Sequence, residues 1–215
     1  MPAASEIFAG LPPPRGDGAE LRASIRAMRA ADGVLLGVLD DDPTGSQAVH
    51  GVQVVTVLAE SACAAALAGP SAACFVLTNT RSLDERAASG RTARAARALL
   101  AAARARDTRI QLVSRSDSTL RGHVMAEVAA LRAVLGADGG GFDAVLLVPA
   151  FLEAGRLTAG DIHWARAGGG LVPVGQTEFA RDSAFGYAAS DLKDFIAEKS
   201  GGAIRPGAVA SITLA

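Results

Sequence analysis

Residues 109–127, RIQLVSRSDSTLRGHVMAE, change character halfway along their length. They begin with an apolar run typical of a β-strand, continue through polar residues, and end in a pattern typical of a helix. A strand followed by a helix is the unit of parallel sheets, because parallel strands need a long crossover connection. If this unit recurs along the chain, it predicts an α/β fold.

Four other apolar runs show that the unit recurs. They begin near residues 34, 52, 74 and 144 and read VLLGVL, VQVVTVL, CFVLTN and AVLLVP. The runs are short and mostly unalternating, as expected for strands that are covered on both faces. We therefore predict a three-layer, Rossmann-like α/β fold: a mostly parallel sheet with helices on both faces.

Helix-like segments lie between these runs. A short helix is expected near residues 20–30, and a longer one after Ser82, where SLDE reads as a capping box with Ser82 as N-cap and Glu85 at the third helical position. This helix is expected to run to about Arg106. The stretches 136–141 and 168–170 are expected to be loops, and residues 208–215, AVASITLA, a strand or a connector.

Length and charge limit the choice of function. The chain has 215 residues, with 21 basic and 22 acidic side chains. Its net charge is close to zero, so the charge balance gives no reason to expect binding to nucleic acid or to an anionic membrane. No apolar window is long enough to cross a bilayer, and Glu6 stands where a signal peptide carries positive charge. Cys63 and Cys74 suit a reduced cytoplasm, as buried small hydrophobic residues. We expect a cytoplasmic protein with a flexible lead-in (1–19) and one domain (20–215).

Candidate functional residues are expected where strands end, because ligands of open α/β sheets bind beyond the carboxyl ends of the strands. Asp40, Asp41 and Asp42 follow the first strand. They form either a solvated turn or a functional cluster that needs a cation, hydrogen-bond donors or a raised pKa. Arg81 follows the third strand and either pairs with an acid or, beside a helix N-terminus, binds an anion.

The stretch 112–127 also contains an arginine that either binds an anion or pairs with an acid of the chain. Ser118 or Thr119 is expected to cap the next helix, with Arg121 in its first turn. A cation in that position opposes the helix dipole, so Arg121 either faces a bound anion or pairs with Asp117 across the turn.

Two further polar stretches follow the last apolar run. PAFLEAGRLT (149–158) carries Gly155 and Arg156, and QTEFARDSAFGY (176–187) carries Thr177, Glu178, Arg181 and Asp182. There is no Walker A motif, no GxGxxG and no GxSxG elbow. With three histidines and no acidic cluster at ligand spacing, no metal site is expected.

Taken in order, these motifs resemble the bacterial four-carbon acid sugar kinases, which phosphorylate threonate, erythronate and related acids with ATP. DDPTGS (41–46) resembles the DDxTG motif of that family, TRSLDE (80–85) its TRS helix start, and SDSTLRGHVMAE (116–127) its DSTLRG signature. PAFLEAGRLT and TEFARD resemble its two later motifs. The family has an N-terminal substrate-binding domain and a C-terminal nucleotide-binding domain, and the chain resembles the first alone.

The resemblance implies roles for these residues. One of Asp41 and Asp42 would orient or deprotonate the attacking hydroxyl. The residues implied in binding the sugar acid are Thr44, Arg81, Arg115, Asp117, Ser118, Thr119, Arg121, Gly155 and Arg156. We expect the two groups to converge on one cavity.

The resemblance also sets expectations about cofactors and partners. ATP and Mg²⁺ would come with the C-terminal nucleotide-binding domain, which is missing here, so this chain alone would bind no cofactor and be inactive. The partners would be the sugar acid and that domain, with a homodimer left open. The alternative is a stand-alone, non-catalytic protein that binds small acids or other proteins.

Overall fold

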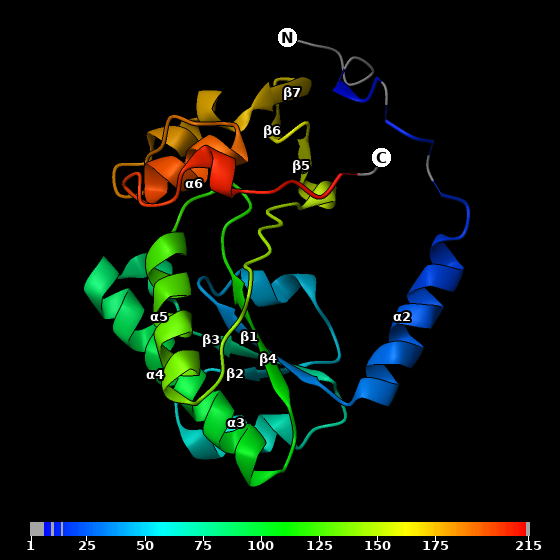
Figure 1. The fold of residues 1–215 in the computed structure, drawn as a ribbon, viewed down its shortest axis with the longest axis vertical. Coiled ribbons are helices and arrows are strands. Elements are labelled where there is room, and N and C mark those ends of the chain that lie inside the picture. Colours follow the sequence, from blue (N-terminus) through cyan, green and yellow to red (C-terminus); the bar gives the residue numbers. More distant parts are fainter. Residues whose placement is uncertain (1–6, 10, 14, 214–215) are drawn as a thin grey trace. The chain divides into compact units, whose positions relative to one another are not determined.

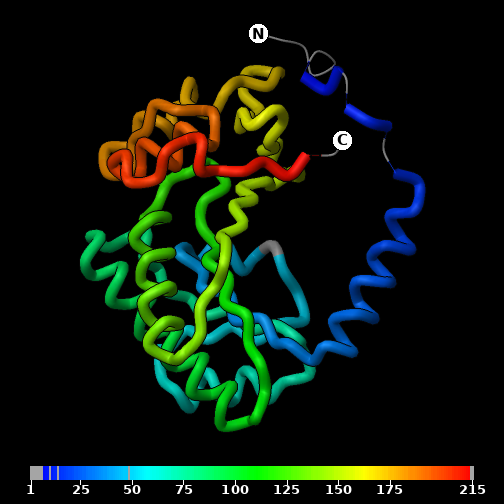
Figure 2. Tube along the Cα trace, viewed as in Figure 1, coloured from blue at the N-terminus to red at the C-terminus, as the bar shows by residue number. Residues whose placement is uncertain are grey.

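The computed structural model describes residues 7–9, 11–13 and 15–213, which form two compact units. We call Arg15–Ser116 with Ala126–Ala144 the parallel unit, and Asp117–Met125 with Val145–Ala215 and the N-terminal residues the antiparallel unit. Each is described by itself (Figures 1 and 2). The lead-in predicted for residues 1–19 lies partly outside the described residues.

The parallel unit is built on a four-stranded sheet in which all strand pairs are parallel. The strand order is β2-β3-β1-β4. The strands are β1 (Leu35–Asp40), β2 (Gln53–Val55), β3 (Ala73–Leu77) and β4 (Ile110–Arg115). Val38 of β1 lies opposite Phe75 of β3 and Val113 of β4. The α/β fold predicted from these apolar runs is confirmed.

The helices of the parallel unit follow the predicted alternation. They are α2 (Gly18–Asp32), α3 (Glu60–Leu67), α4 (Glu85–Ala105) and α5 (Val124–Ala137). Helix α4 starts later than the capping box predicted. Its N-cap is Asp84, whose side chain accepts a hydrogen bond from the Ala87 amide, while Ser82 lies in a preceding short 3₁₀ turn.

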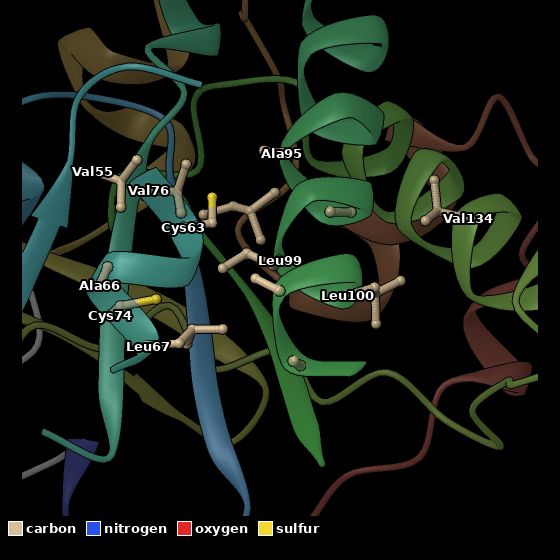
Figure 3. Packing of buried hydrophobic residues seen from close by; sticks show 14 of the residues in the cluster. Val55, Cys63, Ala66, Leu67, Cys74, Val76, Ala95, Leu99, Leu100 and Val134 are labelled. Atoms are coloured by element: carbon tan, nitrogen blue, oxygen red, sulfur yellow. The ribbon is translucent and has the colours of Figure 1, made fainter. Parts of the chain in front are cut away.

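The core of this unit lies between α3, α4 and the sheet (Figure 3). Leu99 of α4 is fully buried, and burying a side chain of this size contributes about 1.5–3 kcal/mol. A Cβ at Gly37 of β1 would lie 2.8 Å from the Leu99 side chain, so this glycine lets the helix approach the strand. Cys63 and Cys74 are fully buried free thiols, as predicted, and burial raises the pKa of Cys74 to about 11.

The antiparallel unit contains a sheet that the sequence analysis did not predict. Its strands are β5 (Arg156–Ala159), β6 (Ile162–Ala167) and β7 (Gly170–Pro173), in that order. Two-residue turns connect them, Gly160–Asp161 and Gly168–Gly169, and all four residues have positive φ, as a type I′ hairpin turn requires. Around the sheet, α6 (Leu192–Lys199) and residues such as Val174, Tyr187 and Phe195 complete a second core.

One predicted strand is absent, because residues 144–150 form no strand. Residues 208–215 were expected to be a strand or a connector. Residues 209–213 form no strand, which leaves the connector, and 214–215 lie outside the described residues. An apolar run becomes a strand only when it finds a neighbour to pair with, and β4 pairs with β1 alone among the described strands. Within the same part of the chain, no helix is long and apolar enough to span a bilayer.

Candidate functional site

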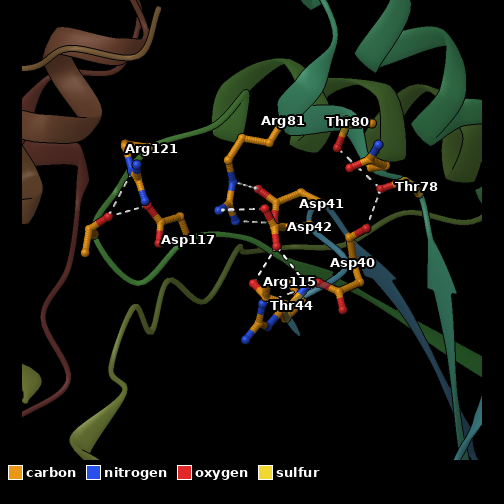
Figure 4. Close-up of polar contacts among 12 residues, drawn as sticks. Asp40, Asp41, Asp42, Thr44, Thr78, Thr80, Arg81, Arg115, Asp117 and Arg121 are labelled. Atoms are coloured by element: carbon orange, nitrogen blue, oxygen red, sulfur yellow. Dashed lines mark hydrogen bonds and ion pairs between the residues drawn. The ribbon is translucent and has the colours of Figure 1, made fainter. Parts of the chain in front are cut away.

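Three consecutive aspartates stand at the carboxyl end of β1, where β3 and β4 also end (Figure 4). Asp40 and Asp41 are buried, whereas the side chain of Asp42 is 25% exposed. Buried carboxylates are costly unless they are paired or protonated, so the surroundings of each determine what it can do.

Arg81 neutralises the second and third of these aspartates. Its Nη2 lies 2.6 Å from Asp41 Oδ1, and its Nε donates to Asp41 Oδ2 at 3.0 Å, which makes a bidentate pair. Its Nη1 lies 3.3 Å from Asp42 Oδ2. Of the two interpretations of Arg81 left open by the sequence, the structure shows the pairing with neighbouring acids.

Asp40 is less well compensated. The guanidinium of Arg115 reaches Asp40 Oδ1 at 3.4 Å, but Asp40 Oδ2 has no hydrogen-bond partner in the described part of the chain. Burial raises the pKa of Asp40, and Arg115 offsets this only in part. Gly45 closes over the pair: a Cβ there would lie 2.1 Å from both Asp40 Oδ1 and Arg115 Nη1. The motif therefore needs glycine at this position.

Asp42 caps the turn that follows. Its Oδ1 accepts hydrogen bonds from the Thr44 amide, at 2.8 Å, and from the Thr44 hydroxyl. Burial would raise the pKa of Asp42, but the Thr44 hydrogen bonds and the charges of Arg81 and Arg115 hold it below its ordinary value. Asp42 is thus ionised near neutrality and is the most accessible of the three carboxylates.

A buried network that the sequence analysis missed supports this end of the sheet. Glu127 of α5 is 4% exposed and accepts hydrogen bonds from Thr80 and, at 3.0 Å, from Ser114 at the end of β4. Thr78 donates to the Asp40 carbonyl at 2.8 Å. Thr80 and Ser114 directly precede Arg81 and Arg115 in the sequence. The sequence signal was an acid in an apolar helix together with hydroxyl residues at two strand ends.

In the antiparallel unit, Arg121 lies in a cluster of hydrogen bonds. Its Nε donates to Asp117 Oδ2 at 2.6 Å and to Thr119 Oγ1 at 3.2 Å, and Thr119 also donates to Asp117. Asp182 lies 3.9 Å from Arg121 Nη1. The pairing of Arg121 with Asp117, one of the two interpretations left open, is therefore observed.

The position predicted for Arg121, in the first turn of the helix, is wrong. Helix α5 begins at Val124. Leu120 and Gly122 have φ values of 64° and 108°, which a right-handed helix does not allow. Arg121 thus projects from a loop, and Ser118 and Thr119 stand too far upstream of α5 to cap it.

Two guanidinium groups meet at one aromatic ring in this unit. Arg121 and Arg156 lie 5.1 Å and 5.7 Å from the centre of the Phe179 ring, within cation–π range. Gly155 precedes Arg156 with a φ of 71°, and a Cβ at Gly155 would lie 2.6 Å from the Cβ of Arg166. Gly155 thus permits the tight approach that starts the hairpin. Phe179 was missed because only folding brings it to the two arginines.

Ser118 contributes its backbone to a buried histidine. His163 Nε2 donates to the Ser118 carbonyl at 2.8 Å, and its Nδ1 accepts from the Thr158 hydroxyl at 2.9 Å. Burial lowers the pKa of His163, so the ring is neutral. His163 ties the loop that precedes Arg121 to the hairpin.

The predicted site residues thus form two groups. The parallel unit brings together Asp41, Asp42, Thr44, Arg81 and Arg115, with Asp40 in addition. The antiparallel unit holds Asp117, Ser118, Thr119, Arg121, Gly155 and Arg156, with Phe179 in addition. Convergence of the two groups on one cavity stays a prediction.

Comparison with known proteins gives a consistent result. Residues 36–213 match the model of a family described as "Sugar-binding N-terminal domain". A solved structure from Bordetella bronchiseptica is 26% identical with a TM-score of 0.55. It is described as a domain of unknown function, DUF1537, with bound citrate, in a domain-swapped dimer. No match was found among curated proteins.

The extent of these matches decides what they show. The structural match covers 76% of this chain but 40% of the other, so this chain spans less than half of that protein's length. The family match, by contrast, covers more than half of this chain. The chain therefore belongs to the sugar-binding N-terminal domain family, the N-terminal part of the four-carbon acid sugar kinases.

Proposed function

We propose that this chain is the substrate-binding half of an ATP-dependent kinase that phosphorylates a hydroxyl of a four-carbon sugar acid of the threonate or erythronate type. The family match supports a sugar ligand. The citrate bound to the Bordetella protein supports a small acid. The observation that carries the proposal is the pair of guanidinium groups, Arg121 and Arg156, over the ring of Phe179.

The arginine pair is suited to a carboxylate. A guanidinium has five N–H donors, and Arg121 spends its Nε on Asp117 and Thr119, so donors remain for an anion. Arg156 has no acidic partner within 4 Å among the residues that the structure describes. Such charge-assisted and bidentate hydrogen bonds are the strongest that proteins make to carboxylates.

For the hydroxyl that is phosphorylated, we assign Asp42 as the contact. Asp41 is buried in its pair with Arg81, whereas Asp42 is partly exposed. Because its pKa is lowered, Asp42 is better suited to orient the hydroxyl through a hydrogen bond than to remove its proton. Phosphoryl transfer depends mainly on such positioning and on charge stabilisation.

We assign ATP and Mg²⁺ to the C-terminal nucleotide-binding domain of the full-length enzyme, and expect this chain alone to be inactive. Magnesium in kinases is usually held by one or two carboxylates together with the phosphates of the nucleotide, so the ion is expected where the nucleotide binds. In this chain both carboxylate oxygens of Asp41 already accept hydrogen bonds from Arg81.

Two further proposals concern setting and assembly. We place the protein in the cytoplasm, where ATP is available and the thiols of Cys63 and Cys74 stay reduced. We also propose a homodimer, since the Bordetella relative was solved as a domain-swapped dimer.

Thermal shift against threonate, erythronate and citrate tests the binding proposal. A ligand present at 100 times its Kd stabilises a folded protein by roughly 2.7 kcal/mol. We expect Arg121→Ala to abolish the shift. Arg132→Ala is a matched control, because Arg132 makes a similar cation–π contact within the parallel unit, 5.0 Å from the centre of the Phe142 ring. If no acid shifts the melt, or if both variants keep the shift, the proposal is wrong.

A further inference from the structure

The segment 144–149, Ala-Val-Leu-Leu-Val-Pro, is an apolar run left in solvent. Val145, Leu146 and Val148 are 50%, 71% and 66% exposed, and the segment forms no strand. A run of four consecutive Val and Leu residues is typical of a strand covered on both faces. Its exposure is unfavourable, and a cluster of this kind usually marks an interaction site.

The parallel sheet has an edge of the kind that such a segment needs. Strand β4 stands at one end of the strand order and pairs with β1 alone among the described strands. The carbonyls of Arg109 and Arg115 accept hydrogen bonds from the Leu35 and Asp41 amides on the β1 side. Backbone groups alternate in direction along a strand. The backbone N–H and C=O groups of the alternate residues Ile110, Leu112 and Ser114 therefore face the other edge of β4, away from β1.

The order of elements favours parallel pairing at this edge. Strand β4 is followed by helix α5 and then by the segment 144–149, which is the arrangement of a βαβ unit. The intervening stretch contains Gly139, Gly140 and Gly141. Consecutive glycines restrict the backbone little, so this stretch can direct the segment towards its own sheet or away from it.

We propose that the segment 144–149 adds as a fifth parallel strand to the β4 edge of a second copy of this chain, and that the second copy does the same in return. In the single chain the segment is exposed and lies outside any sheet. A second copy offers both the complementary edge and the same strand. The exchange therefore closes a two-fold dimer with two identical ladders and covers the apolar side chains. This inference rests on the homodimer proposed above and identifies its contact.

Light scattering after size exclusion tests the assembly. We expect the wild-type chain to have twice its mass of 21.7 kDa, and the Leu146→Asp variant to have that mass once. Leu146 is 71% exposed in the single chain, so the variant should fold, and far-UV circular dichroism checks this. Val57→Asp is the matched control, because Val57 is 68% exposed outside the segment, and it should remain a dimer.

Disulfide trapping tests the partner directly. Cysteine is placed at Leu146 in one chain and at Ile110, Leu112 or Ser114 in another, and the two chains are refolded together and oxidised. Exchange predicts a disulfide-linked band of twice the monomer mass, while Cys63 and Cys74, which are fully buried, should not contribute. A monomeric wild type, a dimer that survives Leu146→Asp, or the absence of this band for all three pairings would overturn the proposal. A monomeric wild type would end both the proposed homodimer and the exchange, whereas a dimer that survives Leu146→Asp would end the exchange alone. Acid binding is measured separately by thermal shift.

Discussion

Replacing Arg81 by alanine should destabilise the parallel unit strongly. The side chain of Asp41 is 2% exposed and both of its oxygens accept from Arg81, at 2.6 and 3.0 Å. Removing one partner of a buried ion pair leaves an uncompensated charge and costs about 3–5 kcal/mol. For a chain of this size that corresponds to a fall in Tm of roughly 6–20 °C.

Urea denaturation at two pH values gives the assay. The free energy of unfolding lost in Arg81→Ala should be largest near pH 8 and smaller near pH 5. Without its guanidinium partner, the buried carboxylate of Asp41 takes up a proton more readily, and protonation removes the uncompensated charge. Combining Arg81→Ala with Asp41→Asn should recover part of the loss. The control is Arg86→Ala, an exposed position on α4, which should change the free energy of unfolding by no more than about 0.5 kcal/mol. A loss below about 1 kcal/mol, or one independent of pH, would refute a charge-compensating role for Arg81.

Two other substitutions test separate features. The pKa of Asp40 is raised in the folded state, so its contribution to stability is present at low pH and is lost as pH rises. Asp40→Asn should therefore stabilise the chain at pH 8 relative to wild type but not at pH 4, as measured by urea denaturation. A loss at pH 8 would mean that the pair with Arg115 outweighs burial. Gly155→Ala should cost at least about 1 kcal/mol more than Gly168→Ala. Both glycines have positive φ, but only Gly155 lies against Arg166. Equal decreases in Tm for Gly155→Ala and Gly168→Ala would contradict this reasoning.

The parts of the fold that the sequence predicted are those with strong local signals. Strands β1 and β3 are short apolar runs with buried residues, β4 is a similar run that is only partly buried, and α4 has a regular apolar face. The start of α4 was placed at Ser82 because serine and aspartate both cap helices, and only the backbone geometry selects Asp84. The hairpins β5–β7 were missed because their strands are short, although Gly160–Asp161 is a recognisable turn signal.

The candidate site was predictable in its residues but not in its contacts. Asp41, Asp42, Arg81 and Arg121 follow from polar motifs at strand ends, yet a sequence does not show whether an arginine pairs with a ligand or with its own chain. The distances show that Arg81 and Arg121 each pair with an aspartate of their own chain. Ligand binding by the remaining donors of Arg121 is a proposal.

Phe179 and Glu127 were missed for a different reason. Each is ordinary in its local sequence. Each gains its role from residues that are more than ten positions away along the chain.

The measurement that most directly tests the central claim compares erythronate with erythritol by calorimetry. Both ligands have a four-carbon hydroxylated skeleton, but only erythronate has the carboxylate that Arg121 and Arg156 are proposed to hold. Hydrogen bonds to a charged group contribute about 1.5–3 kcal/mol, so erythronate should bind at least about tenfold more tightly than erythritol. Equal affinity for the two ligands would contradict recognition of the acid by these guanidinium groups.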